Sequence, residues 1–129
     1  MKRTAFLLFL VPFLALNHFA CAARPSFLPA HDEVLIYSLP FDLVYLRTLE
    51  ALELDPDWDL EETEKEKGTI RVRNVNFTQF ADQDKRTAVF LVKRISRGKT
   101  SVELAPESQR VLGTDRLLQL VSQHVSREL

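Results

Sequence analysis

Alternation of apolar and polar residues in the second half of the chain constrains the fold more than any other feature. Residues 87–95 (TAVFLVKRI) are apolar on both faces as far as Val92, which is typical of a central strand. Residues 99–105 alternate, with Thr100, Val102 and Leu104 on one side of an extended chain. A turn at residues 96–98 separates the two segments, so we expect an antiparallel pair of strands.

Two further alternating segments precede this pair. Trp58 and Leu60 alternate with acidic residues, and residues 69–77 resume the alternation after a turn that ends at Gly68. The acidic side chains Asp57, Asp59 and Glu61 are expected to face Arg71 and Arg73 across the two strands. Opposite charges in such cross-strand pairs contribute about 0.2–1 kcal/mol and help to fix the register. The apolar residues change from one face of the strand to the other after Asn74, which predicts a bulge or a bend near residues 73–74.

Helical periodicity marks two segments. Residues 41–53 follow Pro40, which suits the first turn of a helix, and their apolar face is formed by Phe41, Val44, Tyr45, Leu49 and Leu52. Near the C-terminus, Thr114 is a candidate N-cap for a helix whose apolar stripe is formed by Leu117, Leu118, Val121 and Val125.

A short apolar strand at residues 33–38 completes the pattern. The expected order is β-α-β-β-β-β-α in an α+β fold, with a mainly antiparallel sheet and both helices packed on one face. We expect residues 33–129 to form a single domain, preceded at residues 23–32 by an extended tether that includes Pro25 and Pro29.

The N-terminus has the three parts of a secretory signal peptide, which we place at residues 1–22. Lys2 and Arg3 form a positive region, and an apolar run of 12 residues at 5–16 is too short for a bilayer, which needs about 20. The single cysteine, Cys21, stands in the segment that follows. Cleavage before Cys21 would leave a lipidated first residue, whereas cleavage before Ala23 would discard the cysteine.

Charge excludes one class of partner. Removal of residues 1–22 takes Lys2 and Arg3 with it and changes the net charge from −1 to −3. A chain with this balance is not expected to bind nucleic acid.

Residues 55–66 (DPDWDLEETEKE) have the oxygen spacing of an EF-hand calcium loop. Leu60, however, occupies the position where that loop needs glycine for its sharp turn. A solvated strand face is therefore the favoured interpretation. His31 and His124 have no second ligand at metal spacing, and the chain's three glycines make no phosphate loop. The serines lie in no nucleophile-elbow motif. We therefore expect no metal, no cofactor and no enzymatic activity.

Aromatic and basic residues supply the candidate ligand or partner surface. Trp58, Phe77 and Phe90 could line a ligand pocket, although burial in the core is the simpler interpretation. Arg94 and Arg97 belong to a small basic turn that could contact lipid headgroups or an acidic partner, or could be a solvated hairpin tip.

The leader that ends at Cys21, residues 62–73 (ETEKEKGTIRVR) and residues 113–129 (GTDRLLQLVSQHVSREL) together resemble small bacterial envelope lipoproteins. The arrangement is similar to the helix-grip domains of BamC-type lipoproteins, which are accessories of the outer-membrane β-barrel assembly machine. This resemblance implies a non-enzymatic binding or scaffold role at the outer membrane, a lipid anchor such as palmitate on Cys21 and another envelope protein as partner.

The alternative function is a soluble periplasmic or secreted carrier that holds a small apolar ligand between sheet and helix. An unfilled apolar cavity lined by Trp58, Phe90 and Leu104 would favour the carrier. A filled core with a continuous exposed apolar patch would favour a protein-binding module.

Overall fold

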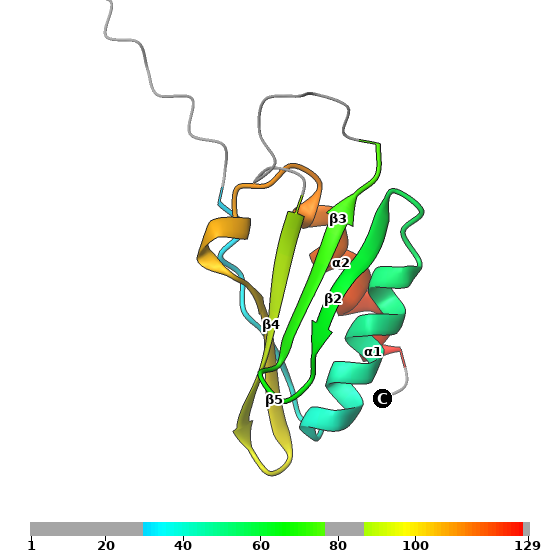
Figure 1. The fold of residues 1–129 in the computed structure, drawn as a ribbon. Coiled ribbons are helices and arrows are strands. Elements are labelled where there is room, and N and C mark those ends of the chain that lie inside the picture. Colours follow the sequence, from blue (N-terminus) through cyan, green and yellow to red (C-terminus); the bar gives the residue numbers. More distant parts are fainter. Residues whose placement is uncertain (1–29, 77–86, 128–129) are drawn as a thin grey trace, which may run out of the picture.

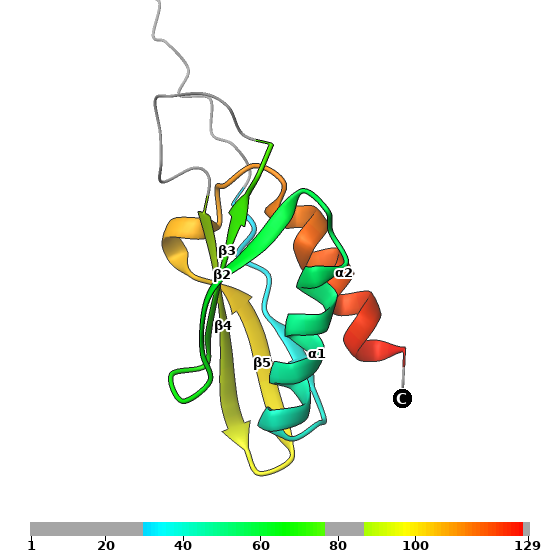
Figure 2. The ribbon, with the colours of Figure 1, turned by 45° about the vertical axis from the view of Figure 1, so that its right-hand side comes forward.

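The alternating segments form one antiparallel sheet, and both amphipathic helices cover the same face of it (Figure 1 and Figure 2). The computed structural model describes residues 30–76 and 87–127. The elements are β1 (Leu35–Tyr37), α1 (Phe41–Glu53), β2 (Trp58–Glu64), β3 (Thr69–Asn74), β4 (Thr87–Ser96), β5 (Lys99–Leu104), the short 3-10 helix η2 (Pro106–Ser108) and α2 (Thr114–Ser126). The predicted fold class and the order β-α-β-β-β-β-α are therefore confirmed.

The strands lie in the order β1-β5-β4-β3-β2, so β1 and β2 are the two edges of the described sheet. Strand β4 is central, as its apolar sequence predicts, because it pairs with both β3 and β5. In one row across the sheet, Ile70 pairs with Phe90 and Phe90 pairs with Leu104. These three side chains are at most 1% exposed. The core therefore lies between the sheet and the two helices.

Helix α1 has the predicted bounds and buries Val44, Tyr45 and Leu52, with Phe41 and Leu49 partly buried against the core. Helix α2 buries its predicted stripe. The predicted N-cap of α2 is wrong. Gly113 takes that place with φ +87°, and the Thr114 hydroxyl donates a hydrogen bond to the Val111 carbonyl at 2.8 Å.

The acidic segment before Gly68 forms β2, and its charges face the arginines of β3. Asp59 pairs with Arg73 and Leu60 pairs with Val72, as predicted. The register then shifts between Leu60 and Glu62, so Glu62, rather than Glu61, lies opposite Arg71.

Of the two possibilities predicted near residues 73–74, a bulge or a bend, the structure has a bend directly after the strand, at residues 75–76. Strand β3 ends at Asn74, whose side-chain oxygen accepts a hydrogen bond from the Asn76 amide at 2.9 Å. Val75 is 44% exposed, so the shift in apolar phase marks the end of the strand.

Gly68 ends the turn between β2 and β3 in a backbone conformation that favours glycine, with φ +68°. Its carbonyl accepts a hydrogen bond from the Val92 amide at 2.7 Å. A Cβ atom on residue 68 would lie 2.0 Å from the Val92 carbonyl oxygen. Glycine is therefore needed for both the dihedral angle and the close approach of the turn to β4.

Substitution Gly68→Ala is expected to lower the free energy of unfolding by at least about 2 kcal/mol, because the left-handed conformation alone costs about 1–2 kcal/mol for an L-residue. Gly98→Ala is the matched control, since a Cβ there would meet nothing within 4 Å. We expect the control to change stability by less than about 0.5 kcal/mol. Denaturant unfolding measures both, and equal losses in the two variants would contradict this account of the turn.

Candidate ligand-binding site

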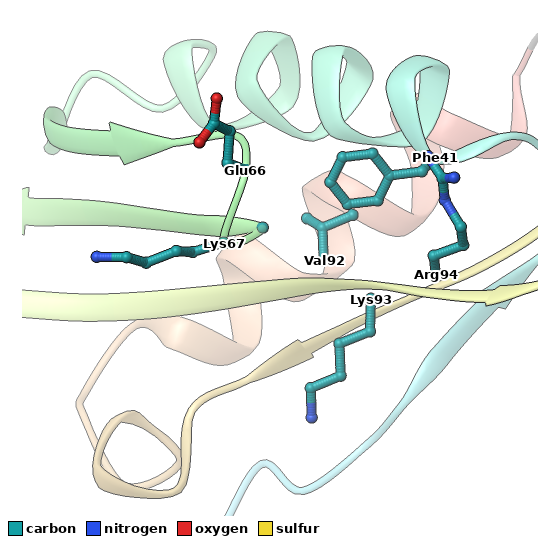
Figure 3. A pocket seen from close by; sticks show the side chains of 7 residues that line it. Phe41, Glu66, Lys67, Val92, Lys93 and Arg94 are labelled. Carbon is teal, nitrogen blue, oxygen red and sulfur yellow. The ribbon is translucent and has the colours of Figure 1, made fainter.

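A pocket lies where β4 runs past the first residue of β3, Thr69. Pairing between these strands reaches Thr69 opposite Leu91, and beyond this point β4 is bordered by the turn that ends at Gly68. The first residue of α1, Phe41, lies above the same part of β4 (Figure 3). The pocket has a volume of about 340 Å³ and is lined by Phe41, Glu66, Lys67, Gly68, Val92, Lys93 and Arg94.

Phe41 and Val92 provide the large apolar groups of the pocket. The Phe41 ring stacks on Tyr45 with 5.7 Å between ring centroids. Val92 is 2% exposed and points toward the helix side of the sheet. A Cβ on Gly68 would be 3.5 Å from Cε2 of Phe41, so the glycine leaves the edge of the ring uncovered.

Arg94 lies beside Phe41, on the other side of the pocket from Glu66 (Figure 3). Its guanidinium carbon is 5.5 Å from the centroid of the Phe41 ring, which is within the range of a cation–π interaction. This contact holds a permanent positive charge next to the apolar part of the pocket.

The two lysines of the pocket are paired with carboxylates outside it. Lys67 lies 2.5 Å from Glu64, and this contact raises the pKa of Lys67. Lys93 forms an ion pair with Glu103 on the neighbouring strand. Within residues 30–76 and 87–127, Arg94 has no carboxylate at ion-pair distance. The two lysines and Arg94 therefore differ in how far their charges are already neutralised.

An ion pair joins the turn to the start of α1. Lys65 lies 2.7 Å from Asp42. The hydrogen bond and charge of Lys65 lower the pKa of Asp42, and the charge of Arg94 acts in the same direction. Tyr45 adds a second link, because its hydroxyl donates a hydrogen bond to the Thr69 carbonyl at 3.2 Å. These contacts fix the two walls of the pocket relative to each other.

A second hollow of about 360 Å³ lies beside the turn and is lined by residues 64–67. All four lining residues, Glu64, Lys65, Glu66 and Lys67, are charged. None of these four residues is of an apolar type, whereas Phe41 and Val92 are among the residues that line the first pocket.

The aromatic residues expected around a cavity lie instead in the core. Trp58 is 5% exposed, while Phe90 and Leu104 are at most 1% exposed and belong to one continuous apolar cluster. These three side chains pack in the core cluster, so a ligand site of the carrier type has to be sought at other residues. Cys21 and Phe77 lie outside the described residues.

The two candidate arginines have different surroundings. Arg94 lines the pocket, whereas Arg97 is exposed in the turn between β4 and β5 and does not. The sequence interpretation did not identify Phe41, Gly68 and Val92 as site residues. The sequence did show that Gly68 ends a turn and that an aromatic residue, Phe41, begins a helix. It did not show that the two lie close together, because this depends on how β3 pairs with β4.

Two acidic residues of the segment with EF-hand spacing, Asp55 and Asp57, have structural partners. Asp55 is 1% exposed, accepts a hydrogen bond from the Asp57 amide at 3.0 Å and lies 3.2 Å from Arg116 of α2. Asp55 therefore ties the end of α1 to the beginning of α2. His124 of α2 lies 3.3 Å from Glu50 of α1. The described part of the chain holds no group of three metal-ligating side chains.

Neither helix in residues 30–76 and 87–127 has the length and apolar character needed to cross a membrane.

Comparisons with known proteins give limited information. No protein-family model matches the chain, and no curated protein matches it. Among solved structures, the chain is similar to the Zhui aromatase/cyclase from Streptomyces sp. R1128. The sequences are 13% identical, the match covers 73% of this chain and 88% of that chain, and the TM-score is 0.37.

The prediction that the chain is not an enzyme requires correction, because the similar structure is named for an enzymatic activity. That prediction depended on the absence of familiar motifs, and such an absence does not exclude catalysis. A similarity at this TM-score assigns neither a reaction nor a ligand to the chain.

Proposed function

We propose that this protein binds a small ligand whose apolar part lies in the pocket between α1 and β4. The observation that carries the proposal is a pocket of about 340 Å³ in which Phe41 and Val92 are surrounded by charged side chains. Ligand sites commonly enclose about 300–1,000 Å³ and combine apolar walls with a few polar groups. The ligand would still lie between helix and sheet, as the carrier hypothesis expected. It would contact Phe41 and Val92, however, and not Trp58, Phe90 and Leu104.

The filled core supports this placement. Trp58, Phe90 and Leu104 pack among the buried side chains of the sheet and both helices. A ligand between these residues would have to displace close-packed side chains, which is costly in a well-packed core. The pocket at Phe41 needs no such displacement.

We also propose that the protein works in the bacterial cell envelope. The three-part leader supports export, and Cys21 at its end supports a lipid anchor at the outer membrane. A soluble periplasmic or secreted protein is the alternative if cleavage removes Cys21. Partnership with another envelope protein, as in BamC-type lipoproteins, stays a prediction from the sequence.

Substitution Phe41→Ala is expected to weaken binding of the neutral probe N-phenyl-1-naphthylamine by about tenfold, because a buried aromatic contact contributes roughly 1.5–3 kcal/mol and 1.4 kcal/mol is a factor of ten. Fluorescence titration of the purified chain gives the dissociation constants. Leu46→Ala is the matched control, since Leu46 also lies on α1, is 52% exposed and is absent from the pocket.

Phe41 also packs against the core, so Phe41→Leu provides a second variant that keeps an apolar contact. We expect a smaller loss of affinity in Phe41→Leu than in Phe41→Ala, with both variants folded by circular dichroism. Absence of probe binding to the native chain, or equal affinities in the native chain and both Phe41 variants, would refute the proposed site.

Expression of the full chain in a bacterium with labelled palmitate tests the anchor. We expect label on the native protein and none on Cys21→Ala, because the thiol of Cys21 is the proposed point of attachment. Unlabelled, soluble protein from both, with a mature N-terminus at Ala23, would contradict the lipid anchor and establish ordinary cleavage.

A further inference from the structure

We infer that the ligand of this pocket is an anionic amphiphile, an apolar molecule with one carboxylate or sulfonate, and that Arg94 binds the anionic group. The inference rests on the proposed function, because it names the chemical class that the pocket between α1 and β4 takes. It adds a specificity-determining residue to a pocket whose apolar walls alone would accept neutral molecules.

The first argument is that the three cationic side chains of the pocket differ in whether they already form an ion pair. Lys67 is paired with Glu64, and Lys93 is paired with Glu103. A ligand anion would have to compete with a protein carboxylate at either lysine. Arg94 contacts the Phe41 ring and, among the residues described, forms no ion pair. Its charge also lowers the pKa of Asp42, but the ion-pair partner of that carboxylate is Lys65. The charge of Arg94 is therefore the one that a ligand can neutralise without breaking an existing pair.

The second argument is geometric. The contact with Phe41 places the guanidinium next to the apolar wall, so one small molecule can touch both the ring and the charge (Figure 3). A guanidinium offers planar pairs of N–H donors that match a carboxylate or sulfonate. Glu66 is the carboxylate among the lining residues, and it lies on the other side of the pocket from Arg94. An anion is therefore favoured at the Arg94 side.

The third argument is the charge of the whole chain. The net charge is −1, and it becomes −3 without residues 1–22. The overall field does not attract anions. Preference for an anion over a neutral molecule of the same shape must then come from a local group, and Arg94 is the group that the pocket provides.

Two probes that differ by one sulfonate group test the inference. 8-Anilinonaphthalene-1-sulfonate carries a sulfonate on the same ring system as neutral N-phenyl-1-naphthylamine. We expect the native chain to bind the sulfonate more tightly. Substitution Arg94→Gln should weaken sulfonate binding by about tenfold and change binding of the neutral probe by less than about twofold. Arg94→Lys should retain part of the preference, because it keeps the charge but loses the planar donors.

Arg97→Gln is the matched control, since it removes the same charge from the same hairpin at a residue outside the pocket. It should leave both affinities unchanged. If the neutral probe binds at Phe41 but Arg94→Gln and Arg97→Gln behave alike, the inference is overturned while the binding site stands. If neither probe depends on Phe41, the proposed function itself fails.

Discussion

One close backbone contact determines the shape of the site. The Gly68 carbonyl accepts a hydrogen bond from the Val92 amide, and a side chain on residue 68 would collide with the Val92 carbonyl. The contact holds the turn after β2 against β4 at the point where β3 begins. Strand β4 continues beyond this point to Ser96, whereas β3 begins only at Thr69, so a turn instead of a strand lies beside this part of β4. The pocket forms because β4 extends past β3 at this end of the sheet.

Packing elsewhere is the reason that we propose this end of the molecule as the ligand site. The row of Ile70, Phe90 and Leu104 is buried between the sheet and both helices and belongs to one continuous cluster of core side chains. The start of α1 lies at the edge of this core, where Phe41 is only partly buried. The exposed ion pair of Lys65 with Asp42 adds a contact between the helix and the turn.

Sequence patterns predicted the fold better than the site, for a physical reason. Alternation and helical period depend on which face of an element is buried, so the bounds of α1 and the buried stripe of α2 followed from the residues. Register is more local: the shift between Leu60 and Glu62 arises from one extra residue in β2, and apolar spacing alone pointed to an irregularity in β3 instead. The pocket joins residues 41, 68 and 92, whose proximity depends on register and helix placement together. Arg94 was identified because its charge was visible in the sequence; its contact with Phe41 was not.

Amide NMR of the isotope-labelled chain during titration with N-phenyl-1-naphthylamine tests the central claim most directly. Occupation of the pocket predicts the largest shift changes at Phe41, Gly68, Val92 and Arg94. The amides of Phe90 and Leu104, which lie in the filled core, should change little. Changes centred on Trp58, Phe90 and Leu104 would place the ligand in the core instead and contradict the account.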